Sequence, residues 1–178
     1  PNMLFASIER PASVYAKANK IDDDAAKQSP GVVAVHEMPV PQAPIAFQPL
    51  GGVAVVAEST YAAMRGRKAL KIECESNQHS AYDSEKFREK LKESAHQAGV
   101  AVRVQGDTAA AEKQAKQVIE ADYYVPHQSQ APMEPPVATA HFKGESCEVW
   151  SSTQTPQATK NTVAAALEIP PENVTVHV

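Results

Sequence analysis

The sequence is short of glycine, cysteine and basic charge, and each shortage excludes a class of protein. Its 178 residues include 7 glycines and 2 cysteines, and 17 Lys+Arg against 21 Asp+Glu give a net charge of −4. Without a basic surface to hold phosphates, we expect no nucleic-acid binding. No apolar run approaches the roughly 20 residues that cross a bilayer, so we expect no transmembrane segment in this chain.

Several motifs of enzyme chemistry are missing as well. The sequence has no GxSxG, GxGxxG or GxxxxGK[ST] motif, which leaves nucleophile-elbow, dinucleotide and P-loop interpretations without support. Its six histidines form no HxH or HxxxH pair, and Cys74 and Cys147 form no CxxC motif. We therefore expect no metal site built from side chains, and two reduced thiols rather than a disulfide.

Proline is abundant instead, and its distribution divides the chain. The 14 prolines gather mainly in two clusters, at residues 39–49 and 126–136. Because proline lacks a backbone N–H and has a fixed φ, both clusters are predicted to be extended connections. We place a domain boundary at the second cluster, which separates residues 1–125 from residues 126–178.

Short apolar runs alternate with capped, amphipathic stretches, which predicts an α+β fold or an α/β fold with mixed sheets. Helices are expected over residues 23–28, 59–68, 84–98 (closed by Gly99) and 107–117, and a last one is expected to start at Pro156 and to be ended by Pro170-Pro171. Strands are expected over residues 3–9, 15–21, 32–36, 52–57, 70–74, 100–104, 118–125, 137–142, 147–152 and 174–178. The last strand runs to the end of the chain, which suggests a piece of a longer protein.

Two polar side chains stand out because their surroundings are unusual. Glu134 lies in the apolar, proline-rich segment 130–136, where a carboxylate is costly unless it is hydrogen-bonded. It either accepts from backbone N–H groups of its loop or takes part in chemistry. Gln154 lies between a predicted strand and helix, among Ser and Thr side chains that are expected to cap that helix. Capping does not explain its uncharged amide, which lies at a strand end, where ligand-facing groups often lie.

Three segments together resemble a known family. They are QAPMEPPVATA (residues 130–140), EVWSSTQTPQ (148–157) and the stretch 164–178 that ends in VTVHV. These resemble the molybdenum-binding large subunit of the xanthine dehydrogenase/aldehyde oxidase family, in particular its branch of isoquinoline 1-oxidoreductase beta subunits and bacterial membrane-bound aldehyde dehydrogenases. Upstream, MLFASIERP (3–11) and residues 30–36 and 51–72 are similar to the α/β-hammerhead domain of that family.

The resemblance implies a fold, a cofactor and partners. The fold would be an α/β-hammerhead domain over residues 1–125, followed by the first strands and helix of a molybdopterin-binding domain over residues 126–178. Gln154 would donate its amide to an oxo ligand of molybdenum, and Gln130 and Glu134 are further candidates for cofactor binding. The cofactor would be a molybdopterin, usually the cytosine dinucleotide form in bacteria. The partners would be an iron–sulfur subunit and, in membrane-bound relatives, a cytochrome subunit.

The chain also departs from the family pattern. Gln130 stands where this branch generally has histidine, and an amide can hydrogen-bond but cannot titrate. The glycine-rich cofactor loop of the family is expected directly after Val178 and its catalytic glutamate further downstream. We therefore assign no catalytic residue within the 178 residues.

The expected function is that of part of a molybdenum hydroxylase. Such an enzyme oxidises an aldehyde or an N-heterocycle by water-derived hydroxylation, with hydride transfer to the molybdenum centre. The 178 residues alone are expected to be inactive and free of cofactor. The alternatives are a non-catalytic module that docks a partner subunit through the helix at 84–98, and a small-molecule-binding domain in which Tyr123 or Tyr124 faces the pocket. The sequence specifies neither the substrate nor the compartment, since similar proteins are both cytoplasmic and membrane-associated.

Overall fold

The computed structural model describes residues 2–45 and 48–178. Its residue contacts divide the chain into two compact units, one made of Pro1–Ala81 and Pro132–Val178 and the other of Tyr82–Ala131. The helices and strands up to residue 81 are β1 (Phe5–Glu9), β2 (Ala18–Asp22), α1 (Asp24–Lys27), β3 (Val32–Met38), β4 (Gly52–Ala57), α2 (Thr60–Ala69) and β5 (Lys71–Cys74).

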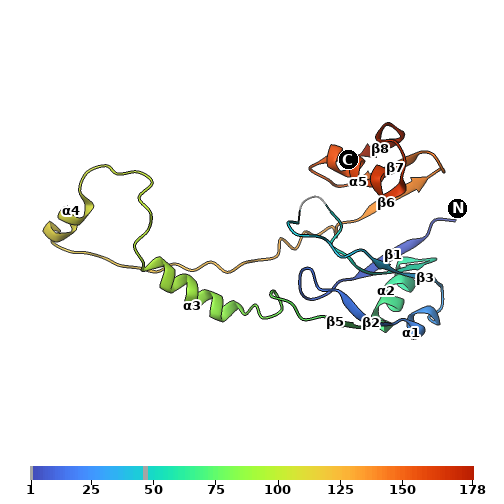
Figure 1. The fold of residues 1–178 in the computed structure, drawn as a ribbon, viewed down its shortest axis with the longest axis horizontal. Coiled ribbons are helices and arrows are strands. Elements are labelled where there is room, and N and C mark those ends of the chain that lie inside the picture. The colour runs from blue at the N-terminus through green and yellow to red at the C-terminus, as the bar shows by residue number, and fades with distance from the viewer. Residues whose placement is uncertain (1, 46–47) are drawn as a thin grey trace. The chain divides into compact units, whose positions relative to one another are not determined.

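The N-terminal part is built around the antiparallel sheet β1-β4-β3, with β4 in the middle. Alternate residues of β4 are buried, namely Val53, Val55 and Ala57, because successive side chains of a strand point to opposite faces. Helix α2 packs on β1 and β4 (Figure 1), and its Ala62 and Ala63 form a core cluster with Ala57. Strands β2 and β5 pair separately as a two-stranded antiparallel sheet.

Residues 82–131 contain two helices, each begun by an aspartate cap. Helix α3 (Ser84–Ala95) starts at Asp83, whose side chain accepts from the backbone N–H of Lys86 at 2.9 Å. Helix α4 (Thr108–Gln114) starts at Asp107, whose side chain accepts from Ala110 in the same way. Both helices are shorter than expected: α3 has its C-cap at His96 rather than ending at Gly99, and α4 ends at Gln114.

The strands expected over residues 100–104 and 118–125 do not form (Figure 1). Both stretches are fully described, and neither pairs with another strand. A strand without a partner leaves its backbone hydrogen-bonding groups to water and is not stable alone. The prediction of strands over these two stretches is therefore wrong, because an alternating apolar pattern does not by itself supply a partner strand.

Residues 132–178 form a small three-stranded sheet with one helix. The elements are β6 (Ala138–Phe142), β7 (Cys147–Ser151), α5 (Pro156–Leu167), a 3₁₀ turn (Pro171–Asn173) and β8 (Val174–His177). Strands β6 and β7 pair as an antiparallel hairpin, and β8 pairs parallel to β7. Cys147, Val149, Ala164 and Val174 make the core. Helix α5 ends at Leu167, and its C-cap Glu168 has a left-handed conformation two residues before Pro170.

The predicted mixture of helices and small sheets is confirmed, while the domain boundary at residue 125 stays a prediction. Cys74 and Cys147 are both free thiols, as expected; Cys74 is exposed and Cys147 buried. Within the described part of the chain, no helix combines the length and apolar character that crossing a bilayer requires.

Candidate functional site

A cavity lies where β7 and β8 end, and it includes one of the predicted site residues. Its volume is about 300 Å³, and its lining includes Glu134, Trp150, Ser151 and His177. Because β7 and β8 are parallel, their carboxyl ends meet at one edge of the sheet, the usual position of ligand sites in such arrangements. Trp150 and His177 are register partners there, and their rings stack with centroids 5.0 Å apart at 14°.

Gln154 lies in the turn that leads from the carboxyl end of β7 into α5. Its side chain is exposed and makes no hydrogen bond with any residue that the structure describes. The turn is closed without it, because the Thr153 hydroxyl accepts from the backbone N–H of Thr155 at 3.1 Å and from the Thr159 hydroxyl at 3.2 Å. The expected capping by Thr155 itself is not seen, since this N-cap residue makes no side-chain cap bond. The Gln154 amide is thus left free to donate.

Glu134 is exposed rather than enclosed by its apolar loop. No hydrogen bond joins it to the described part of the chain, so the expectation that it accepts from loop N–H groups is wrong. The desolvation cost that motivated that expectation does not arise for an exposed carboxylate. Gln130 is also exposed and belongs to the other compact unit, Tyr82–Ala131. The structure therefore brings Glu134 to the β7/β8 cavity, while the binding roles of Gln130, Glu134 and Gln154 stay predictions.

The stacked pair of Trp150 and His177 was not singled out from the sequence. Trp150 was seen only as part of a strand and His177 only as one of six scattered histidines. Their meeting depends on the parallel register of β7 and β8, which joins residues 27 positions apart. No local pattern encodes that register, so only the paired strands reveal that these rings form a wall of the cavity.

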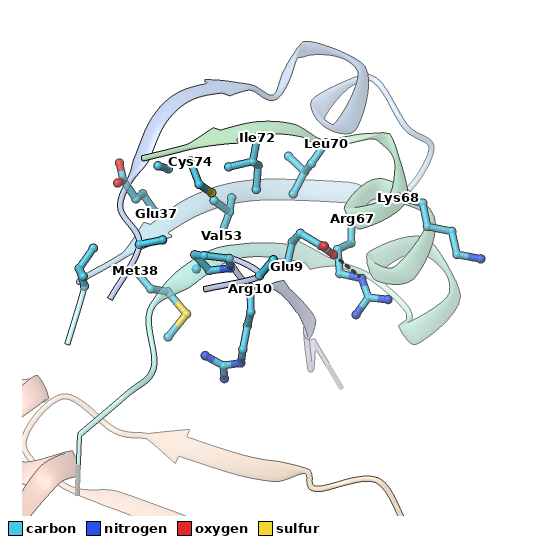
Figure 2. Close-up of a pocket in the computed structure, with 16 residues that line it drawn as sticks. Glu9, Arg10, Glu37, Met38, Val53, Arg67, Lys68, Leu70, Ile72 and Cys74 are labelled. Atoms are coloured by element: carbon cyan, nitrogen blue, oxygen red, sulfur yellow. Dashed lines mark ion pairs between the residues drawn. The ribbon is translucent and has the colours of Figure 1, made fainter. Parts of the chain in front are cut away.

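A second, larger cavity lies in the N-terminal part between the two sheets (Figure 2). Its volume is about 570 Å³, and its apolar wall includes Val53, Leu70 and Ile72. Glu9 and Arg67 lie at its edge, where Arg67 Nε is 3.4 Å from Glu9 Oε2. None of the three predicted site residues lines it. Arg67 belongs to the basic cluster Arg65-Gly66-Arg67-Lys68, and its side chain contacts β1 through Glu9 and the carbonyl oxygen of Ile8.

No group of three or more His, Cys, Asp or Glu side chains in residues 2–45 and 48–178 is arranged to hold a metal ion. The residues around the β7/β8 edge offer neutral donors, a single carboxylate and a stacked imidazole. Such a set suits contacts to a bound organic group and not direct coordination of a metal.

Comparison with known protein families gives a match that includes the β7/β8 edge. The sequence model of the family described as molybdopterin cofactor-binding domain matches residues 90–178. The chain is also 28% identical over 188 aligned residues to the isoquinoline 1-oxidoreductase subunit beta of Brevundimonas diminuta. That alignment covers 99% of this chain and 22% of the relative, so the chain spans about a fifth of that protein's length.

Solved structures of related enzymes share the fold. Quinoline 2-oxidoreductase from Pseudomonas putida 86 aligns with a TM-score of 0.63 at 20% identity, over 99% of this chain and 26% of that one. Aldehyde oxidoreductase from Desulfovibrio gigas aligns with a TM-score of 0.59 at 18% identity, over 97% of this chain and 23% of that one. CO dehydrogenase from Oligotropha carboxidovorans aligns with a TM-score of 0.57 at 22% identity, over 100% of this chain and 27% of that one. At these identities the likeness shows the fold alone.

Proposed function

Because the chain belongs to the molybdopterin cofactor-binding domain family, we propose that it is part of a molybdenum hydroxylase in which Gln154 faces the cofactor. The observation that carries the proposal is the free amide of Gln154, which is exposed at the carboxyl end of β7 and unpaired among the described residues. A neutral N–H donor stabilises a negatively polarised oxygen of a bound group without competing for its metal.

The residues present fit such a group. When bound, a molybdopterin supplies a redox-active metal whose electronics the protein tunes by hydrogen bonds and burial. Gln154 would orient the group by donating its amide, and Glu134 would contribute a carboxylate from the β7/β8 cavity. Gln130 would add a second neutral amide in place of a titratable imidazole. The glutamate that the family resemblance assigns to proton abstraction would lie downstream of Val178, so we give no residue of this chain that role.

The finer assignments are part of the same proposal. Residues 1–125 would form an α/β-hammerhead domain and residues 126–178 the first part of the cofactor-binding portion, although the family match begins earlier, at residue 90. The substrate would be an aldehyde or an N-heterocycle, the cofactor the cytosine dinucleotide form, and the electrons would leave through an iron–sulfur subunit. The non-catalytic alternative is not favoured, because each relative reported above is named as an oxidoreductase or a dehydrogenase.

The test uses the complete natural polypeptide that contains these residues, purified with its partner subunits. We expect stoichiometric molybdenum and dye-linked oxidation of an aldehyde or N-heterocycle. Gln154→Ala should lower kcat by about 100-fold, the typical effect of removing one preorganised donor, with the molybdenum content retained. Gln157→Ala is the matched control, because this amide bonds Asn161 at 2.9 Å on the surface of α5. Absence of molybdenum would refute the enzyme assignment, and an unchanged kcat in Gln154→Ala would refute the role of Gln154.

A further inference from the structure

The turn that contains Gln154 is held by a side chain of helix α5. The Thr159 hydroxyl donates to Thr153 Oγ1 at 3.2 Å, and it shares its single proton with the carbonyl oxygen of Thr155, also at 3.2 Å. Thr153 and Thr155 are the two chain neighbours of Gln154. Thr159 therefore makes hydrogen bonds on both sides of the residue that is proposed to face the cofactor.

Only one of these two bonds is ordinary for a threonine in a helix. A helical threonine hydroxyl often bonds the carbonyl oxygen four residues back, which for Thr159 is that of Thr155. The Thr159 backbone N–H also donates to this oxygen, at 3.0 Å. Thr153 lies before the N-cap residue of α5, so the bond to its hydroxyl reaches out of the helix into the turn. Helix formation alone does not require this bond, and we call it the clamp.

The Thr153 hydroxyl is the centre of the arrangement. Its oxygen accepts from the Thr159 hydroxyl and, at 3.1 Å, from the backbone N–H of Thr155, and these two bonds use both of its acceptor positions. Pro156 follows Thr155 as the first residue of α5, and its ring fixes the backbone angle φ there. The backbone is thus held on both sides of Gln154, while the Gln154 side chain is exposed.

A held backbone matters for a residue that acts by donating one hydrogen bond. Only the side-chain torsions of Gln154 then have to be ordered when its amide donates. A donor that is placed in advance stabilises a charged oxygen better than one that must move into position. Without the clamp the turn could shift, and a displacement of about 1 Å is enough to slow a reaction by up to about 100-fold.

We propose that Thr159 is a positioning residue, whose hydroxyl holds Thr153 and so orients the Gln154 amide toward the bound cofactor. Thr159 makes no contact with the cofactor in this proposal and acts through the turn. The bonds that carry the inference all lie within residues 153–159. It rests on the proposed function in one respect, namely that Gln154 is the donor.

Two substitutions separate the hydroxyl of Thr159 from its shape. Thr159→Val keeps the branched shape and removes the donor, whereas Thr159→Ser keeps the donor. In the complete natural polypeptide with its partner subunits, Thr159→Val should lower kcat about tenfold, with KM changed by less than about twofold and molybdenum retained. Thr159→Ser should behave like the parent. Equal losses of kcat in the two variants would overturn the proposal, because the hydroxyl would then not be the group that matters.

A second measurement does not depend on activity. Hydrogen exchange resolved to single amides should show the Thr155 amide exchanging at least about tenfold faster in Thr159→Val than in the parent, with or without molybdenum. Thr159→Ser and the amides of residues 160–167 should keep the parent rates. An unchanged Thr155 rate in Thr159→Val would overturn the proposal. Faster exchange throughout α5 would also overturn it, because Thr159 would then hold the helix and not the turn.

A double-mutant cycle tests whether Thr159 acts through Gln154. In a Gln154→Ala background no amide is left to orient, so Thr159→Val should lower kcat by less than about twofold. A loss of about tenfold in both backgrounds would overturn the positioning role, since the effect of Thr159 would then be independent of Gln154.

The same variants separate the failure of this inference from the failure of the proposed function. A lowered kcat in Gln154→Ala beside an unchanged kcat in Thr159→Val would refute the positioning role alone. An unchanged kcat in Gln154→Ala would refute the proposed role of Gln154 and the positioning role with it. Faster exchange of the Thr155 amide in Thr159→Val would in that case still show that the clamp closes the turn.

Discussion

At the residue scale, Gly66 determines how closely α2 approaches the sheet. A Cβ atom at this position would lie 2.7 Å from Val32 Cγ2 and 2.9 Å from Val55 Cγ1, both too close for a carbon–carbon contact. Helix interiors normally disfavour glycine by about 1 kcal/mol relative to alanine. Here the close packing of helix on sheet requires it, although the sequence offered only a glycine within a basic cluster.

We predict that Gly66→Ala destabilises the chain by about 1–3 kcal/mol, because the overpacked methyl group displaces β-branched side chains of a tight core. Chemical denaturation followed by circular dichroism measures this change. Gly99→Ala is the control, since a Cβ there meets nothing within 4 Å, and its unfolding midpoint should not fall. A stabilised Gly66→Ala variant would mean that α2 lies further from the sheet than the structure shows.

At the element scale, helix starts were predictable because a cap and its partner lie within one turn of each other. Ser59 and Asp107 were each expected to begin a helix, and each accepts a backbone N–H three residues on; the cap of α3 is Asp83, one residue before the expected start. Helix ends were less predictable: α3 has its C-cap at His96, three residues before the glycine that was expected to close it. In the absence of packing to hold the last turn, the capping glycine alone does not extend a helix.

The Ser59 cap provides a test at this scale. Ser59→Ala should cost about 1 kcal/mol, because the N–H of Ala62 loses its acceptor at 3.2 Å and α2 covers the main sheet. Ser59→Asp should recover most of that loss, since a carboxylate also accepts the bond and favours the helix N-terminus. Thermal unfolding of the three proteins measures the difference. Equal midpoints for Ser59→Ala and the parent would show that α2 is held by packing alone.

At the scale of the whole molecule, the two compact units differ in how far their backbones are protected. The unit Pro1–Ala81 with Pro132–Val178 contains all the paired strands and both core clusters of the described chain. The unit Tyr82–Ala131 has helices without buried residues. Segments with few buried contacts open at little free-energy cost, so their peptide bonds are the most accessible to proteases.

We predict that trypsin cuts the 178-residue chain first at Arg103 and Lys116, which lie outside helices and strands. Cleavage there should be at least about tenfold faster than at Lys20 or Lys71, because those residues belong to the paired strands β2 and β5 and must first be released. Mass spectrometry of timed digests gives the order of cuts. Early products from Lys20 or Lys71 would contradict the division into a protected and an open unit.

The sequence by itself determined the local structure and the family resemblance. Caps, prolines and apolar periods act over a few residues, so β4 was predicted with its bounds Gly52–Ala57 and α5 with its start at Pro156. The segments that contain Glu134 and Gln154 were enough to indicate the family resemblance, because each is a short continuous stretch of sequence.

The tertiary structure alone decided which distant residues meet and which expected strands form. Trp150 stacks on His177 because β8 pairs parallel to β7. The amide of Gln154 is free because the hydrogen bonds that close its turn are made by threonine side chains instead. The stretches 100–104 and 118–125 have the sequence pattern of strands, and yet neither pairs with a described strand. Strand formation depends on hydrogen bonds to a partner strand, which is often remote in sequence, and a local pattern does not provide that partner.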